Sequence, residues 1–511
     1  MLTFVVHAAA MVGMLACLMP GVPGGLPHGV AERAAYVAQQ PWLWRIGWLG
    51  WQATAASDVY LSIAYVCTRW VPRRAAWFGL IVTLLALVPD QVGQFFWSVT
   101  GPGRAADAIA SGNLATYEAW EGRVFQAVGG WGAGLYLIAS VGWAMSLHGA
   151  GLWTRALTVC SIAAGTLFAV AVVLLCLPTS IWSIPMLMSV GALNGFAFIA
   201  LLCWFAEATE HVMRHARPDT PHGRHARWVY PRPGVYGRIV SYVANSRFVR
   251  GLFEYVPALT MASDIRDVVY VNYLVGADRL AALVPPPLQL QSVGPDGGLA
   301  MFTFLTYRHG HFGPQLFGPL RRLWRSPVQS NWRLYVHDPV SGTDGIYFLT
   351  TAITAVPYAL AARLLSEGVP MHVPARATVE PNGGGYDIAL DPGNGTAPDA
   401  HLSLRPAAAD LPTSWQTVFA TPEAALAYCV PQDRALNVQP WYGRVTRQEI
   451  RLDIPLADCR WLTGEVRSDA ARAIVGNAEP VCFAVDRVQF FYDGEWRHPL
   501  AATRRYDAAH A

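Results

Sequence analysis

Five polar side chains in the C-terminal half have the types and the spacing to bind a small anion. They are Arg308, His309, Gln329, Arg333 and Tyr335. An arginine side chain binds a carboxylate through two parallel hydrogen bonds, and the other side chains could orient or protonate a bound molecule. We expect these five residues to form a ligand-binding site. The alternatives are a polar loop for Arg308 and His309, and a solvent-facing side chain for Arg333.

The alternation of residues around Arg333 predicts a strand with two different faces. Arg333 and Tyr335 share one face, whereas Trp332, Leu334 and Val336 lie on the other. Since the apolar face should pack in a core, the Arg333 face should meet either solvent or a polar cavity. If Arg308 also points inward, the two arginines could hold one carboxylate between them.

The complete absence of lysine excludes several kinds of chemistry. The sequence has 37 basic residues, and all of them are arginine. A protein Schiff base and a P-loop both require a lysine amine. The sequence also contains neither a Gly-x-Ser-x-Gly elbow nor a His-Glu-x-x-His zinc motif. Its formal net charge of +3 gives no argument for nucleic-acid binding.

A second set of polar residues interrupts the apolar N-terminal half. Asp58 lies near the middle of one apolar run, and Asp90 and Gln94 lie four residues apart in the next. A carboxyl group inside a membrane is costly to bury when charged, so it is a functional hypothesis by default. The first interpretation is a proton or ligand site. The second is a protonated aspartate that is hydrogen-bonded to a neighbour, or an Asp90 that lies near the membrane surface.

The composition predicts a membrane domain. Its helices would contain Asp58 and Asp90 and position them. Hydrophobic residues make up 53% of the chain and charged residues 14%. Six runs are long and apolar enough for a spanning helix, which needs ~20 residues. They are 3–20, 46–68, 76–99, 124–147, 156–177 and 184–206. The first could be a cleaved signal peptide, but no basic residue precedes Val5, so we expect an uncleaved helix. Tryptophans near the helix ends predict an aromatic belt, with core packing as the alternative.

The placement of arginine predicts the orientation of these helices. Arg69, Arg73 and Arg74 lie between the second and third runs, and Arg155 lies between the fourth and fifth. Many more arginines follow the sixth run. By the positive-inside rule, we expect a multi-pass protein of the bacterial inner membrane with both termini in the cytoplasm.

The segment 207–260 is polar and rich in arginine and histidine. Its histidines are His211, His215, His222 and His225. Prolines break any helix that would align them, so we expect no metal site. Arginines next to a membrane instead attract anionic lipid.

From residue 262 the apolar period changes to two, which is typical of strands. The expected strands are 262–274, 299–306, 332–337, 345–353, 371–379, 385–390, 400–404, 445–454 and 481–492. Short helices are expected at 276–284, 357–366 and 421–429, and a hairpin turn at Asp493-Gly494. These elements predict an α+β domain with an antiparallel, barrel-like sheet.

The motifs of this half resemble those of the bacterial YqjF-like family (domain of unknown function 2071), which is placed in the acetoacetate decarboxylase-like superfamily. They are GLAMFTFLTYRHG, SPVQSNWRLYVHD, GTDGIYFLTTAI and VPARATVE. The resemblance covers 265–380 well and 380–495 in outline, and it does not reach the membrane half. It implies the superfamily fold, and this sequence supplies Arg308, Arg333 and Arg376 at the arginine positions of the family pattern.

The resemblance does not carry the superfamily chemistry to this chain. Acetoacetate decarboxylases use a lysine Schiff base, and this chain has no lysine. It also has Gln329 where the superfamily places an acid. We therefore expect a six-helix transmembrane domain at 1–206, a connector at 207–260, an acetoacetate decarboxylase-like domain at 261–500 and a tail at 501–511. The expected function is binding of a small carboxylated or apolar ligand, without a cofactor or nucleic acid. The alternatives are a lysine-free enzyme, or a transporter or sensor that uses Asp58 and Asp90.

Overall fold

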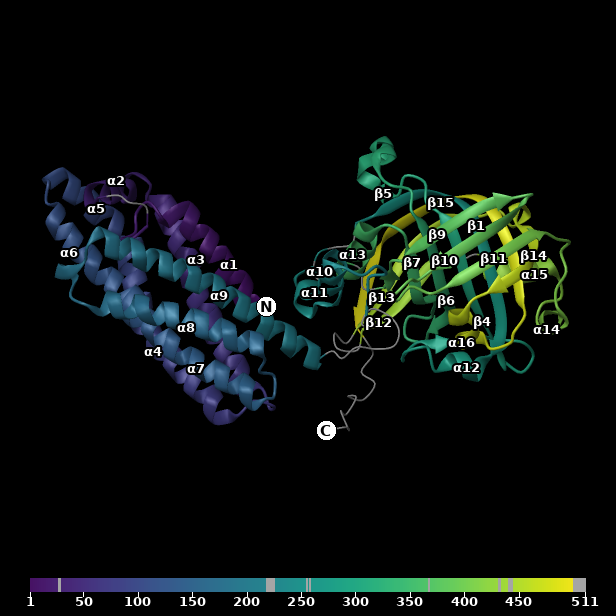
Figure 1. The fold of residues 1–511 in the computed structure, drawn as a ribbon, viewed down its shortest axis with the longest axis horizontal. Coiled ribbons are helices and arrows are strands. Elements are labelled where there is room, and N and C mark those ends of the chain that lie inside the picture. Colours follow the sequence, from purple (N-terminus) through teal and green to yellow (C-terminus); the bar gives the residue numbers. More distant parts are fainter. Residues whose placement is uncertain are drawn as a thin grey trace. The chain divides into compact units, whose positions relative to one another are not determined.

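The chain divides into a helical unit and a unit built mainly of strands (Figure 1). The computed structural model describes residues 1–25, 29–216, 226–253, 256, 259–365, 368–430, 433–439 and 444–499. The helical unit is Met1–Met213 and the second unit begins at Arg214. The expected tail at 501–511 lies outside the described residues.

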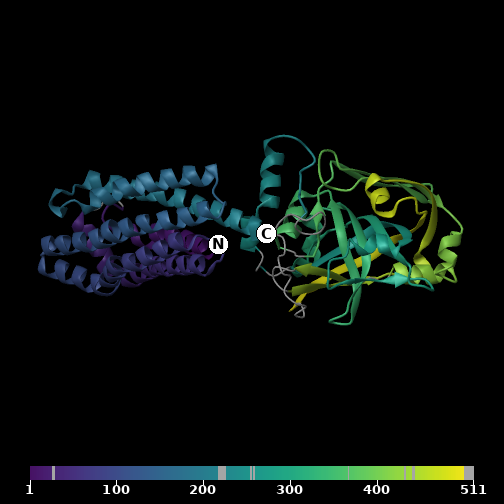
Figure 2. The same ribbon diagram turned by 90° about the horizontal axis from the view of Figure 1, so that it is seen from below.

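The helical unit is a bundle of long helices that run side by side, as both ribbon views show (Figures 1 and 2). Its helices are α1 (Leu2–Gly13), α2 (Val30–Gln39), α3 (Pro41–Cys67), α4 (Arg73–Phe95), α5 (Gly101–Ser111), α6 (Leu114–Phe125), α7 (Ala133–Gly149), α8 (Arg155–Cys176) and α9 (Ile184–Ala216). Three short π-helical segments continue α1, α4 and α6: Met14–Leu18, Phe96–Thr100 and Gln126–Gly132. The six apolar runs expected from the sequence are all helical.

Four of the described helical segments are long and apolar enough to cross a membrane. They are Arg73–Ser111, Leu114–Gly149, Arg155–Cys176 and Ile184–Ala216. The first and second of the six expected spans do not reach that standard. The segment Leu2–Leu18 is too short, and α3, although 27 residues long, contains Arg45, Gln52 and Asp58. The four apolar helices suggest a membrane-associated protein.

Three tryptophans of this bundle form a buried cluster with residues of α2, α5 and α6. Trp44, Trp48 and Trp97 pack against one another with ring centroids 4.8–6.0 Å apart. Trp44 and Trp97 are fully buried, so these two belong to the core and not to an aromatic belt. Trp42 and Trp77 are exposed, as a belt requires.

The second unit contains one continuous sheet whose central strands close into a ring. Its main strands are β1 (Met261–Gly276), β4 (Leu299–Arg308), β6 (Val328–Asp338), β7 (Thr343–Ile353), β9 (Arg376–Asn382), β10 (Gly385–Asp391), β11 (Ala400–Pro406), β12 (Arg434–Gln439), β13 (Arg444–Asp453), β14 (Arg460–Arg467) and β15 (Pro480–Pro499). The order β1-β4-β6-β7-β12-β13-β15 closes because β15 also pairs with β1. All these pairings are antiparallel except β7–β12. The expected fold class, a helical bundle plus an α+β domain with a barrel-like sheet, is confirmed.

The two faces of the ring pack into two different cores. Trp332, Leu334 and Val336 of β6 lie in one core, together with Val379 and Ile388 of the strands β9 to β11. The other face of β6 turns toward Tyr270, Phe348 and two helices, α14 (Thr413–Gln416) and α15 (Pro422–Cys429). We call it the Arg333 face. Both faces are therefore buried.

Part of the segment 207–260 packs as an integral piece of the second unit. Trp228 is fully buried, and its indole N–H donates to the Met371 carbonyl oxygen at 2.9 Å. Arg363 of α13 (Val356–Leu365) donates to the carbonyl oxygens of Ala226 and Ala244. The helices α10 (Val235–Asn245) and α11 (Arg247–Phe253) lie here, and Arg247 is buried.

The predicted hairpin turn at Asp493-Gly494 is wrong, because β15 continues to Pro499. Glu449 pairs with Gly494, and Ile450 pairs with Tyr492, so Asp493 is an extra residue in the ladder. Gly494 has φ 148°, a conformation that glycine adopts easily. A bulge with this backbone explains why a turn-like dipeptide lies inside a strand.

Candidate functional site

Arg333 is a buried cation in the interior of the second unit. Its exposed fraction is 3%. Its Nη2 donates to the carbonyl oxygen of Cys429 at 3.1 Å, and its Cζ lies 5.7 Å from the ring centroids of both Tyr270 and Tyr335. Cys429 ends α15, so this hydrogen bond caps the carbonyl end of that helix.

A short polar chain links Arg333 with two neighbouring strands. The Tyr335 hydroxyl donates to the same Cys429 oxygen at 3.0 Å and lies 3.1 Å from Thr303 Oγ1. Thr303 in turn donates to Asn272 Oδ1 at 2.8 Å. Strands β1, β4 and β6 thus each place a polar side chain in the Arg333 face.

The guanidinium of Arg333 has no anionic partner among the described residues. No described Asp or Glu pairs with it, and its Nε is buried without a hydrogen-bond acceptor. Burial raises the pKa of Tyr335 to about 12 and also raises the pKa of Tyr270, so both hydroxyls are neutral at pH 7. The helix end supplies only a partial negative charge. A buried donor of this kind is costly unless an acceptor fills the position.

His309 and Gln329 form a second network on the same face of β4 and β6. His309 Nε2 lies 2.8 Å from Gln329 Oε1, and His309 Nδ1 lies 2.8 Å from Ser263 Oγ. Gln329 Nε2 donates to Asn331 Oδ1, and Asn331 donates to the Tyr307 hydroxyl. Burial lowers the pKa of His309 to about 4, and its hydrogen bond with Gln329 opposes that shift. The imidazole is therefore neutral at pH 7.

Arg308 does not join Arg333, because the two side chains lie on opposite faces of the sheet. In the register of β4 with β6, Thr303 pairs with Arg333 and Arg308 pairs with Val328, so Thr303 and Arg308 have opposite parity. Arg308 Nη2 donates to the Val379 carbonyl oxygen, and its Nε lies 3.8 Å from Asp267 Oδ2. A site in which both arginines hold one carboxylate is therefore not formed.

Two surface hollows of this unit lie away from Arg333. One is lined by Arg376, Asp387 and His401, and the other by Asp264 and Arg487 among others. Neither is lined by Arg333, Tyr335, Gln329 or His309. Arg333 and Tyr335 are buried in the interior of the unit, in a core that includes residues of α14 and α15.

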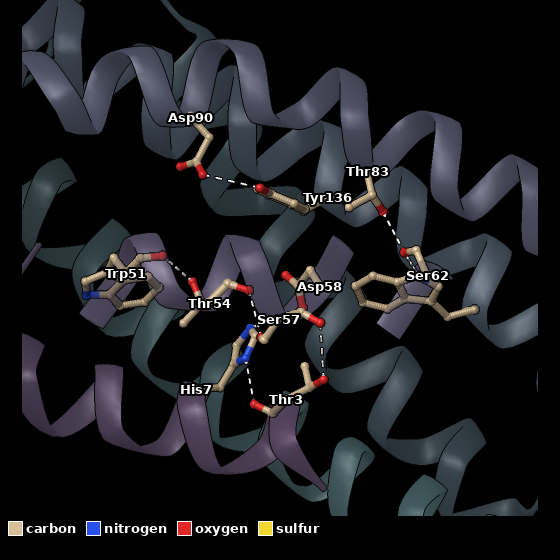
Figure 3. A network of polar contacts seen from close by, with 11 residues as sticks. Thr3, His7, Trp51, Thr54, Ser57, Asp58, Ser62, Thr83, Asp90 and Tyr136 are labelled. Carbon is tan, nitrogen blue, oxygen red and sulfur yellow. Dashed lines mark hydrogen bonds and ion pairs between the residues drawn. The ribbon is translucent and has the colours of Figure 1, made fainter. Parts of the chain in front are cut away.

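The acids that the sequence predicts to lie inside the membrane, Asp58 and Asp90, also lie among polar contacts, in the helical unit (Figure 3). Gln94 Nε2 donates to Asp90 Oδ1 at 2.8 Å, as their spacing on one helix predicts. The Tyr136 hydroxyl of α7 donates to Asp90 Oδ2 at 3.3 Å. Asp58 of α3 lies near His7 of α1, with His7 Nε2 3.7 Å from Asp58 Oδ1.

Sequence reasoning missed several members of the Arg333 face. Alternation along β1 could have shown that Tyr270 and Asn272 share one face of that strand, and alternation along β4 could have assigned a face to Thr303. Their pairing with β6 depends on the register, which no local pattern contains. Cys429 contributes a backbone oxygen, so its side-chain type gave no signal.

Among the described residues, no group of three or more His, Cys, Asp or Glu could hold a metal ion. The described His211 lies beside Glu207, with 3.0 Å between Nε2 and Oε1. His222 and His225 of the histidine-rich segment lie outside the described residues.

Comparisons with known proteins match the second unit. Residues 262–414 match the family model of DUF2071, described as an uncharacterized conserved protein. No curated protein matches the chain. Among solved structures, an acetoacetate decarboxylase from Legionella pneumophila is similar at 12% identity, over 47% of this chain and 88% of its own, with a TM-score of 0.33.

Two further solved structures are similar to about the same share of this chain, also at low identity. The enduracididine biosynthesis enzyme MppR, complexed with pyruvate, shows 20% identity over 48% of this chain and 91% of its own, with a TM-score of 0.31. An acetoacetate decarboxylase-like enzyme from Sphingomonas wittichii RW1 shows 12% identity over 48% of this chain and 94% of its own, with a TM-score of 0.32. The match over residues 262–414 thus confirms the resemblance of the second unit to the YqjF-like family. The structural neighbours are acetoacetate decarboxylase-like proteins. The N-terminal part is not recognised.

Proposed function

We propose that this is an integral membrane protein whose second unit binds a small carboxylated ligand at Arg333, without Schiff-base chemistry. The observation that carries the proposal is the buried guanidinium with an Nε that has no acceptor among the described residues. A carboxylate supplies both the missing acceptor and the missing negative charge. The sequence, which contains no lysine, excludes a protein Schiff base for any such ligand.

The surroundings of Arg333 favour a ligand with an apolar body. Trp415, Phe419 and Tyr428 lie in the same core, and Tyr428 stacks on Tyr335 with ring centroids 5.2 Å apart. Aromatic side chains bind flat apolar groups well. We therefore propose an aromatic or branched carboxylic acid as the ligand class.

We also propose that the bilayer is the protein's partner and that the second unit lies in the cytoplasm. Four apolar helices support membrane insertion. The arginines between α3 and α4 and at the start of α8 support a cytoplasmic location for those helix ends. We propose the inner membrane of a bacterium as the location.

Calorimetric titration of the full-length protein with benzoate tests the ligand proposal, and benzamide is the neutral control of the same shape. We expect benzoate to bind and benzamide not to bind. The change Arg333→Leu removes all the guanidinium donors and should weaken benzoate binding by ~2–5 kcal/mol. Arg333→Lys should restore little, because an ammonium group does not reproduce the planar pair of donors.

Arg376→Leu is the matched control, since Arg376 is an exposed arginine on a strand of the same unit. This variant should bind benzoate as the wild type does. Equal benzoate affinity in the wild type and in a folded Arg333→Leu protein would refute the proposal.

A further inference from the structure

His7 and Asp58 form a buried acid–base pair in the helical unit, separate from the Arg333 site (Figure 3). His7 lies on α1 and Asp58 on α3, and their exposed fractions are 4% and 7%. His7 Nε2 lies 3.7 Å from Asp58 Oδ1. Two titratable side chains from two helices therefore face each other inside the bundle.

The hydrogen bonds around this pair fix where hydrogen atoms must be. His7 Nδ1 lies 2.8 Å from the Thr3 carbonyl oxygen, and a carbonyl oxygen only accepts. Nδ1 therefore carries a hydrogen atom, and Nε2 is the nitrogen that faces Asp58. Asp58 Oδ1 is buried and has no hydrogen-bond partner among the described residues.

Without a further proton, lone pairs of Nε2 and Oδ1 would face each other in a buried, apolar environment. Burial of unsatisfied polar atoms costs free energy, and two facing acceptors repel as well. A single proton removes both problems, because it turns one partner into a donor. At 3.7 Å, a small rotation of the carboxyl group would bring the pair to hydrogen-bond distance.

The described helices packed around the pair present aromatic rings and a few titratable groups to it. Helix α9 presents the rings of Phe198 and Phe205 to His7, at centroid distances of 5.6 and 5.0 Å. Asp90 of α4 and Tyr136 of α7 are the titratable groups that interact electrostatically with this region. They are hydrogen-bonded to each other, as Figure 3 shows.

Asp90 differs from Asp58 in its hydrogen bonds. Its carboxylate accepts from Gln91 Nε2 and Gln94 Nε2, both at 2.8 Å, and from the Tyr136 hydroxyl at 3.3 Å. Three donors satisfy an ionised carboxylate. Asp58 Oδ1 has no hydrogen-bond donor among the described residues, so the two acids have different hydrogen-bond environments.

We propose that the helical unit contains a proton-binding site at which His7 Nε2 and Asp58 Oδ1 share one proton, separate from the hydrogen-bonded Asp90. Proton uptake adds one positive charge to the pair, and release leaves a neutral His7 and an ionised Asp58. The site takes a proton and no other ligand. It goes beyond the function proposed above, because it involves none of the residues of the Arg333 face.

Infrared difference spectroscopy of the full-length protein in liposomes, between high and low pH, tests this proposal. We expect the wild type to show a carboxyl or imidazole band that changes with pH and shifts in D₂O. The variants Asp58→Asn and His7→Gln should lose the same band to the same extent, because one proton belongs to both residues. Asp90→Asn should keep it.

Asp107→Asn is the control, because Asp107 is an exposed acid on α5. Size-exclusion elution and circular dichroism establish that each variant is folded, and His7→Gln decides the question if Asp58→Asn is not. A band that survives in folded His7→Gln would overturn the shared site. A spectrum of Asp58→Asn or His7→Gln that equals the wild-type spectrum would overturn the proposal as a whole.

Discussion

At the scale of residues, the sequence predicted correctly that Arg333 and Tyr335 share a face. It did not predict which side chains of the neighbouring strands contact them. Arg333 and Tyr335 lie on one face of β6, as alternation predicts, and this face is buried. The sequence left open whether Arg308 points the same way. The register of β4 answers that question, because it places Arg308 opposite Val328 and on the other face. Registers depend on cross-strand packing over many residues, so a single strand does not reveal them.

The buried His309 predicts how stability changes with pH. Its folded-state pKa of about 4 lies below the unfolded value of ~6.5. The folded state therefore favours the neutral imidazole, and the unfolded state takes up the proton first. Stability should be complete above pH ~6.5 and should fall as the pH approaches 4, by up to ~3 kcal/mol from this residue.

Thermal unfolding of the full-length protein between pH 7 and pH 4 measures this effect. His309→Asn should lose less stability with acid than the wild type. It should not lose all of the pH dependence, because burial, followed by the charge of Arg363, lowers the pKa of His372 to about 3. His401→Asn, a change of an exposed histidine on β11, should leave the pH profile unchanged. An identical pH profile for His309→Asn and the wild type would contradict this account of His309.

At the scale of elements, strands with clear alternation were predictable and short polar strands were not. The strands at 261–276, 299–308 and 480–499 match expected ones to within a few residues, apart from the C-terminal extension of the last. β12 and β14 were missed, because Arg434–Gln439 and Arg460–Arg467 mix charged and apolar residues without a clean period of two. They are strands because β13 and β15 provide partners.

The packing of Trp228 predicts that the segment before β1 stabilises the second unit. Trp228 is 0% exposed and lies in a cluster with Val240, Phe312 and Met371. Trp228→Ala should lower the free energy of unfolding by ~3–5 kcal/mol, because it leaves a cavity and an unpaired carbonyl oxygen. Chemical denaturation of the full-length protein measures the change.

The control for this prediction is another tryptophan of the same unit. Trp496 on β15 is 62% exposed, so Trp496→Ala should change the stability by less than ~0.5 kcal/mol. If the two substitutions had equal effects, the segment around Trp228 would not be part of the folded unit in solution.

At the scale of the whole molecule, the sequence predicts two properties: the division into two units and the orientation in a membrane. The division into an apolar helical unit and a strand-rich unit follows from composition and periodicity, since these differ sharply between the halves. The orientation in the membrane follows from arginine alone and stays a prediction. A reporter fused after residue 511 should lie in the cytoplasm. Green fluorescent protein at that position should therefore fluoresce, and alkaline phosphatase should be inactive. Alkaline phosphatase activity at that position would reverse the proposed topology.

We propose above that the buried Arg333 binds the carboxylate of a small ligand. A structure of the full-length protein determined with benzoate would locate the ligand relative to this side chain. We predict a carboxylate oxygen within ~3.2 Å of Arg333 Nε, the donor that has no acceptor among the described residues. Benzoate bound at another position, with Arg333 Nε still unpaired or bonded to a group of the protein itself, would show that Arg333 does not bind the carboxylate.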